Sequence, residues 1–82
     1  MKNEHKQFKT SDFYTASYLR ARGFKIATVD FADPRRALFV FEDNKDRQCL
    51  IEDFLFGRAS VEPKSFVVAI KELKQLLHSN TP

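Results

Sequence analysis

The sequence contains little of what small proteins use to build chemical sites. Among its 82 residues it has one cysteine, Cys49, and two histidines, His5 and His78. A metal centre in so small a protein needs Cys and His clustered at ligand spacing, and these three residues are far apart along the chain. The sequence therefore predicts no metal centre. A single cysteine also excludes a disulfide within the chain, which leaves core packing, a ligand or self-association to stabilise it.

Glycine is also scarce, with only Gly23 and Gly57 in the chain. A phosphate-binding loop needs several closely spaced glycines, so this class of nucleotide site is excluded and no cofactor is expected. Each glycine instead follows a helical pattern, where its left-handed backbone is expected to end the helix.

Long apolar runs are absent too. No stretch reaches the roughly 18 apolar residues of a membrane-spanning helix, and the N-terminal MKNEHKQFK is charged. We expect neither a signal peptide nor a membrane contact, and a reducing cytoplasm is the expected location. Cys49 is interpreted as a small buried or half-buried apolar group, because the carboxylates near it oppose a thiolate.

Carboxylates are plentiful, but their positions favour structural roles. Adjacent acids at 42–43 and 52–53 lie where helix caps and solvated helix faces are expected. Acid–base catalysis would require a pocket around them, and a chain of this length has little interior from which to form one. We therefore expect no catalytic residues and no enzymatic activity. A small enzyme subunit is the weakest alternative.

Apolar periodicity predicts three helices. They cover residues 10–22, a segment from 43 to 57, and a segment that starts at Pro63 and continues to 79. The expected caps are Thr10 or Ser11 for the first helix and Asp43 or Asn44 for the second. His78 in the last turn of the third helix interacts favourably with the helix dipole, which explains it without a chemical role.

Between the first two helices, FKIATVDF and ALFVFED are typical of strands, with ADPRR as the turn of an antiparallel hairpin. The alternation slips between Ile26 and Ala27, which indicates either a bulge or burial on both faces. The order α-β-β-α-α predicts an α+β fold in which three helices pack on a two-stranded hairpin. We expect one domain over residues 10–79, preceded by a flexible tail of residues 1–9.

The predicted hairpin carries apolar side chains on both faces. The first and third helices can cover one face, so the other needs a second cover, either from the second helix or from another copy of the protein. Self-association into a homodimer is therefore predicted. The residues expected to form that contact are Phe31, Leu38, Phe39, Val40 and Phe41.

The net charge is +3 and the sequence pI is near 9.2, which favours solubility and a weak attraction to polyanions. A basic set near the hairpin is the candidate contact for nucleic-acid phosphates or for a partner: Arg20, Arg22, Lys25, Arg35 and Arg36. A solvated turn is the alternative explanation. A β-ribbon that reads DNA would also show polar side chains where this hairpin has leucine, valine and phenylalanine.

Four parts of the chain together carry a resemblance: FKTSDFYTASYLRARGF, the paired strands, DFLFGRASVEP and FVVAIKELKQLL. Within residues 8–78 the matching positions are Thr10, Asp12, Tyr14, Ala16, Leu19, Gly23, Phe24, Phe39, Phe41, Phe54, Gly57, Val61, Phe66, Leu73 and Lys74. The ensemble resembles a family of small uncharacterised bacterial domains, some from mobile-element or phage-like contexts. The resemblance implies no assigned activity and favours DNA-related or regulatory partners.

These observations favour a non-enzymatic protein-interaction module that self-associates through its hairpin or binds an unknown protein partner. An accessory nucleic-acid-binding protein, with its basic patch around the hairpin tip, is the alternative. In both cases we expect contact rather than catalysis.

Overall fold

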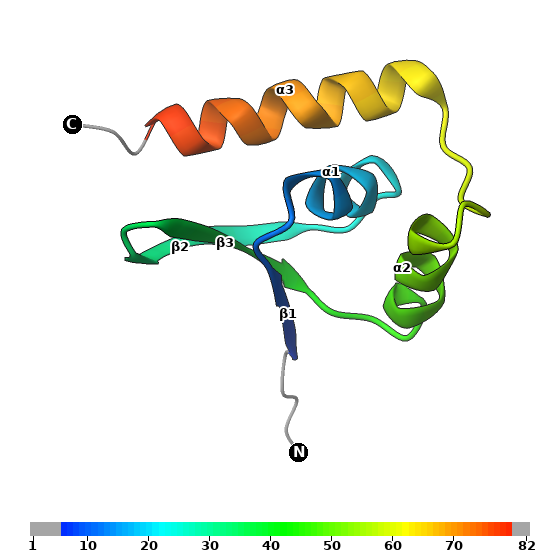
Figure 1. The fold of residues 1–82 in the computed structure, drawn as a ribbon, viewed down its shortest axis with the longest axis horizontal. Coiled ribbons are helices and arrows are strands. Elements are labelled where there is room, and N and C mark those ends of the chain that lie inside the picture. The colour runs from blue at the N-terminus through cyan, green and yellow to red at the C-terminus, as the bar shows by residue number, and fades with distance from the viewer. Residues whose placement is uncertain (1–5, 80–82) are drawn as a thin grey trace.

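The computed structural model describes residues 6–79. The elements are β1 (Gln7–Thr10), α1 (Phe13–Ala21), β2 (Ile26–Asp33), β3 (Arg36–Glu42), α2 (Arg47–Leu55) and α3 (Pro63–Ser79). The predicted α+β class and the order α-β-β-α-α are confirmed, with one additional strand before the first helix. The strands form one antiparallel sheet in the order β1-β3-β2. Helices α1 and α3 lie over one face of this sheet, and α2 packs beside α1 (Figure 1).

Strand β1 corrects the expected end of the N-terminal tail. Residues 7–10 pair with β3, and Phe8 lies opposite Phe41. Burial alternates along QFKT, because Phe8 and Thr10 are half-buried while Gln7 and Lys9 are exposed, and Phe8 packs against the core. With a single apolar residue, the segment has too short a pattern to predict this strand from the sequence. The remainder of the expected tail, residues 1–5, lies outside the described residues.

Helix α1 begins one residue after its cap, Asp12. The Asp12 carboxylate accepts hydrogen bonds from the backbone N–H of Thr15, at 3.0 Å, and from the Thr15 hydroxyl. The caps expected from the sequence, Thr10 or Ser11, are therefore wrong, because Asp12 is the residue that can reach the free N–H of the first turn. The Thr10 hydroxyl instead accepts from the Asp12 N–H at 3.1 Å. Gly23, with φ of 98°, follows the helix end as expected.

Strands β2 and β3 form the predicted hairpin, and the slip in its alternation is a bulge. The register shifts between Ile26 and Thr28, so that two residues of β2 lie against one of β3. As a result Ile26 and Val29 both pack against the core, although their spacing is odd. At the turn the Asp33 side chain accepts from the Arg35 N–H at 2.9 Å, as expected for this turn.

The core lies between the sheet and the pair α1 and α3. Its buried members are Ala16, Leu19, Phe24, Phe39, Phe41 and Leu73. Helix α1 has five consecutive buried residues, Thr15 to Leu19, because the sheet, α2 and α3 enclose it on most sides. Its two buried polar side chains are satisfied, since the hydroxyl of Thr15 donates to Asp12 and that of Ser17 donates to the Phe13 carbonyl at 2.9 Å.

Helix α2 starts later than expected, and α3 starts where it was expected. The predicted caps Asp43 and Asn44 lie in the turn before α2, where Asn44 Oδ1 accepts from the Asp46 N–H at 2.8 Å. That turn delays the helix until Arg47, and Asp46 makes no side-chain capping bond. Helix α3 begins at Pro63, in agreement with the prediction.

Candidate interaction surface

The hairpin residues predicted for self-association are mostly enclosed. Phe39 and Phe41 face α1 and α3 in the core, and Val40, on the opposite parity, is also buried. Val40 lies in the central strand between Lys9 of β1 and Thr28 of β2, so two neighbouring strands shelter it without a second layer. The expectation that α2 or another copy must cover this face is therefore wrong, because it assumed a two-stranded hairpin without β1.

Of the remaining hairpin candidates, Leu38 is half-buried and Phe31 is 37% exposed. The outer edge of β2 is a poor template for pairing with a second copy. Its register shifts twice, between Ile26 and Thr28 and between Asp30 and Asp33, and such irregularities turn an edge away from regular pairing. The hairpin thus offers a small contact area at most.

Two of the five predicted basic residues have structural partners. The guanidinium of Arg20 pairs with Glu72 of α3 at 3.0 Å and donates to the Phe24 carbonyl at 3.2 Å. Arg22 donates to the Ser60 carbonyl at 2.7 Å. These bonds attach the end of α1 to α3 and to the segment before it, so both arginines contribute to packing rather than to a free patch.

The other three, Lys25, Arg35 and Arg36, are exposed but do not form one surface. Lys25 precedes β2 and the arginines follow it, which separates them by roughly 25 Å at the rise of an extended strand. At the hairpin tip Arg35 lies 4.0 Å from Asp33, and Asp30 is close in sequence. Two acids and two arginines between 30 and 36 sum to zero charge. The contact of this tip with nucleic acid or a partner stays a prediction.

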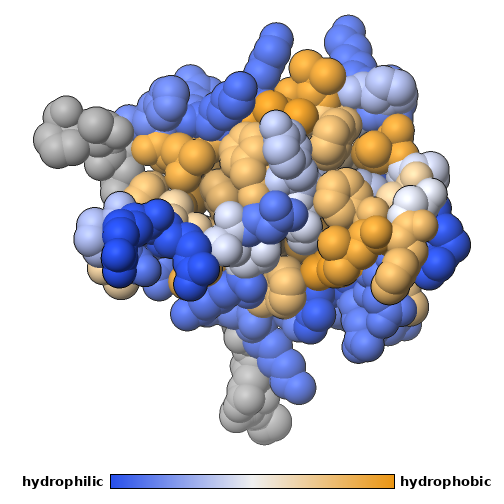
Figure 2. Space-filling model, in the orientation of Figure 1, coloured by the Kyte–Doolittle hydropathy of each residue, from blue (hydrophilic) through white to orange (hydrophobic). Residues whose placement is uncertain are grey.

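A different surface is exposed on the helices. Tyr14 of α1 is 57% exposed, Leu55 of α2 is 65% exposed and Val67 of α3 is 47% exposed. Figure 2 shows apolar side chains gathered over α3 and α2 on the side from which the start of α1 is seen end-on. We call this surface the helical apolar face, and define it by Tyr14, Ile51, Leu55, Phe66, Val67 and Ile70.

Helical spacing and aromatic contacts bring these residues together. On α2, Ile51 and Leu55 are one turn apart. The ring of Phe54, between them, stacks on Tyr18 of α1 at 5.0 Å, and Tyr18 is one turn from Tyr14. Helices α1 and α2 therefore contribute adjoining parts of one surface, and α3, which packs on α1, continues it in Figure 2. The signal in the sequence is weak, because each residue lies at the margin of an apolar stripe that is otherwise core.

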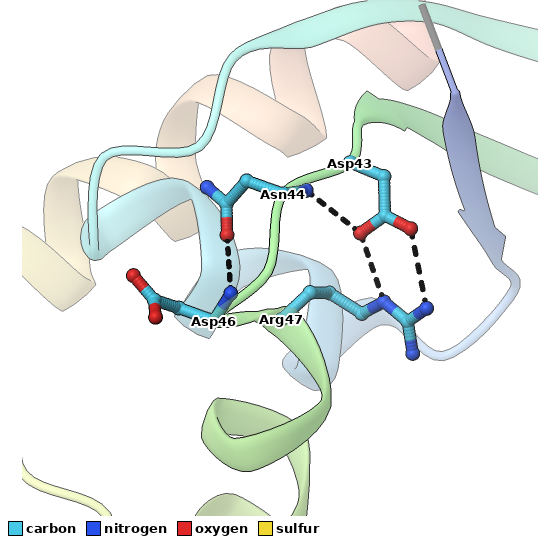
Figure 3. Close-up of polar contacts among 4 residues, drawn as sticks. All are labelled: Asp43, Asn44, Asp46 and Arg47. Atoms are coloured by element: carbon cyan, nitrogen blue, oxygen red, sulfur yellow. Dashed lines mark hydrogen bonds and ion pairs between the residues drawn. The ribbon is translucent and has the colours of Figure 1, made fainter.

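Helix α2 is attached to the rest of the fold by a polar contact at its start. The Arg47 guanidinium donates two hydrogen bonds to the Asp43 carboxylate, at 3.1 and 3.2 Å, and Figure 3 shows both. The same guanidinium lies 4.2 Å from the centre of the Phe8 ring in β1. The Arg47 hydrogen bond lowers the pKa of Asp43 below its usual value, against the opposing effect of burial. This contact connects α2 to two strands.

All of these elements lie within one family match. The DUF5659 family, described as a domain of unknown function, matches residues 5–79. The chain belongs to this family. No curated protein and no solved structure matches it. The predicted resemblance to a domain of unknown function is thereby confirmed, while its bacterial or mobile-element context stays a prediction.

The far side of the DUF5659 domain has two adjoining shallow grooves between the end of α1 and the start of α3. Their volumes are about 620 and 400 Å³, and both are lined by Ala21, Glu62 and Ser65. Glu62 is already used, because its carboxylate accepts from the N–H groups of Lys64 and Ser65 and from the Ser65 hydroxyl. These hydrogen bonds lower the pKa of Glu62. The groove carboxylate is therefore a helix cap.

The remaining chemical candidates of the DUF5659 domain are isolated. Cys49 is exposed on α2, so the expectation that it is buried or half-buried is wrong. Within residues 6–79 no three His, Cys, Asp or Glu side chains are grouped as metal ligands would be. Over the same residues, no helix combines the length and hydrophobicity that crossing a bilayer requires.

Proposed function

We propose that this DUF5659 domain is a non-enzymatic interaction module that binds a partner protein through the helical apolar face. The observation that carries the proposal is the exposure of Tyr14, Leu55 and Val67 on adjoining parts of three helices. Exposed apolar side chains scattered singly are ordinary, but neighbouring ones on one surface mark contact sites. An aromatic residue beside branched aliphatic ones is also the composition of a typical interface centre.

The fold supports this assignment because the surface is held on a rigid base. Helix α1 is nearly enclosed, and α3 packs on it through Ala69 and Leu73. Side chains on such elements keep their positions in the free protein, which reduces the ordering cost of binding. The hairpin, by contrast, has buried most of its apolar side chains. Self-association remains one form of this function, now assigned to the helices.

A photo-crosslinking amino acid placed in the full chain tests the proposal. At position 14 or 55 it should give one discrete adduct in the native host, whose partner is then identified by mass spectrometry and purified. The matched control is position 56, since Phe56 is as exposed as Leu55 but lies on another side of the end of α2. Leu55→Glu should then abolish binding of the purified partner. Equal adducts from position 56, or adducts only from the hairpin tip, would refute the assignment.

Nucleic-acid binding is the second candidate function. The supporting observation is that Lys25, Arg35 and Arg36 are exposed in a chain of net charge +3. Phosphate contacts give an affinity that falls steeply with salt and depends little on sequence. Fluorescence anisotropy with labelled DNA at low salt should show such binding, and the double change Arg35→Ala with Arg36→Ala should weaken it for all sequences alike. No binding at low salt would remove this candidate.

A further inference from the structure

Helix α3 carries a basic stripe beside the helical apolar face. Lys71 and Lys74 are exposed, and their spacing of three places them on one side of the helix. Lys64 instead lines the groove on the far side, together with Glu62 and Glu72. Val67 lies within the same stripe. His78, one turn after Lys74, extends it to the last turn. The polar edge of the contact surface along α3 is therefore built from cations.

No acid on α3 compensates this stripe. The only carboxylate of the helix is Glu72, which lies toward the opposite side and pairs with Arg20. Among the described residues, no ion pair involves Lys71 or Lys74. Their charges are thus available to a molecule that approaches the face.

The acids on the neighbouring elements are engaged differently. On α2, Asp53 pairs with Arg58 at 3.3 Å, and Glu52 accepts from the Gln48 amide at 3.3 Å. At the start of α1, Asp12 is the helix cap. Glu62 and Glu72 lie in the far groove beside Lys64. Among the described residues, Lys71 and Lys74 are therefore the cations of α3 beside the helical apolar face that no ion pair involves.

We infer that the segment that covers the helical apolar face is an acidic amphipathic helix of another protein; this inference rests on the proposed function and names the chemistry of the partner. A facing helix repeats its side chains every three to four residues, which matches the spacing of Val67, Lys71 and Lys74. Its apolar residues contact Tyr14 and Leu55, and its carboxylates contact the lysines at the polar edge, where charges determine partner choice.

Other occupants fit the surface less well. A nucleic acid matches the lysines but presents phosphates to the apolar side chains, which then stay unburied. A second copy of the chain presents the same lysine stripe, and like charges brought together oppose association. An acidic amphipathic helix is the occupant that matches both the apolar and the charged parts.

Two synthetic amphipathic peptides test the inference with the full chain. They share one apolar heptad pattern, and one has glutamate and the other lysine at every polar position. Fluorescence anisotropy should show tighter binding of the glutamate peptide, with an affinity that falls as salt is raised. Chemical shift changes in the isotope-labelled protein should be largest at residues of the helical apolar face.

Charge reversal provides the decisive variant. Lys71→Glu combined with Lys74→Glu should weaken binding of the glutamate peptide by about tenfold, the effect of 1.4 kcal/mol, and should improve binding of the lysine peptide. The matched control is Lys9→Glu combined with Lys25→Glu, because these lysines are exposed away from the face and the net charge changes equally. The control should leave the preference for the glutamate peptide in place.

Each other outcome overturns the inference in a distinguishable way. If both peptides bind the face equally, the contact surface stands and the acidic partner is wrong. If neither peptide binds and sedimentation shows a dimer that Leu55→Glu dissociates, a second copy is the occupant. Binding of both peptides away from the face, or shifts produced there only by an oligonucleotide, would refute both the inference and the proposed function.

Discussion

Helices α1 and α2 have nine residues each, and they differ sharply in burial. Five residues of α1 are buried, whereas no residue of α2 is. Helix α1 lies between the sheet and α3, and Asp12 caps its start through its side chain. Helix α2 lies beside α1, and its N-cap residue, Asp46, makes no side-chain capping bond. It depends instead on Arg47 and on the stacking of Phe54 against Tyr18.

The two helices therefore have different roles: α1 supports the fold, and α2 exposes side chains to solvent. An element enclosed on most sides fixes the positions of its neighbours, and an element attached along one side is free to expose the other. Helix α2 therefore contributes Leu55 to the helical apolar face at little cost to stability, while α1 supplies the base on which both α2 and α3 rest. Of the three helices that form the helical apolar face, α2 is the one without a buried residue.

The largest expected difference in stability is between alanine substitutions of one leucine in each helix. Leu19→Ala in α1 removes a fully buried side chain and should cost about 2 to 5 kcal/mol of unfolding free energy. Leu55→Ala in α2 should change it by no more than about 0.5 kcal/mol. Urea denaturation of both variants measures the contrast. Similar losses at the two positions would mean that α2 is part of the core.

The second-largest expected effect on stability comes from removing the polar contact that attaches α2. Arg47→Ala removes two charged hydrogen bonds to Asp43 and the contact with the Phe8 ring, and should cost about 1 to 3 kcal/mol. Native-state hydrogen exchange should show lost protection in α2 before any loss in α1. The control is Arg58→Ala, because its pair with Asp53 is more exposed and such pairs contribute about 0 to 1 kcal/mol. Equal effects would contradict a special role for Arg47.

The glycines that follow the two helices allow a matched comparison of backbone strain. Gly23 has φ of 98° and Gly57 has φ of 75°, and an added Cβ meets no atom within 4 Å at either position. Alanine at each site should therefore cost about 1 to 2 kcal/mol through backbone conformation alone. D-Alanine, introduced by chemical ligation, should be tolerated at both. Thermal unfolding distinguishes the two cases, and a destabilising D-alanine would point to a hidden steric contact.

The smallest expected effect is the pH dependence of α2. Because the folded pKa of Asp43 is lowered from its ordinary value of 3.8, its contribution to stability is present above that value. The contribution is lost as the pH falls through the folded pKa. Acid titration followed by NMR should show α2 signals changing before those of α1, and Asp43→Asn should remove that difference. Simultaneous loss of both helices would show that the contact does not act locally.

Much of the local structure could be predicted from the sequence. The helix ends near Gly23 and Gly57, the start of α3 at Pro63, the turn at Asp33 and the irregularity after Ile26 each depend on the conformational preference of one or two residues. Such preferences act over a few bonds and are little affected by the rest of the chain. The cap residues of α1 and α2 could not be predicted, because several adjacent Ser, Thr, Asp and Asn residues can act as a cap and only the folded geometry decides which one does.

The contact surface could not be predicted in the same way. Phe39, Val40 and Phe41 have the composition of an exposed contact, and Tyr14, Leu55 and Val67 lie next to core stripes and have that of a core. Helices α1 and α3 enclose Phe39 and Phe41, and strand β1, whose four residues complete the sheet beside β3, shelters Val40. The five basic residues likewise become two structural arginines and separate exposed charges only after packing.

Composition and local pattern by themselves determined an α+β domain with three helices and a hairpin. Tertiary structure alone decided which apolar side chains meet solvent and which charges meet each other. The physical reason is range: backbone preferences act between neighbours in sequence, whereas burial and ion pairing depend on segments such as β1 and β3, or Arg20 and Glu72, that are distant along the chain.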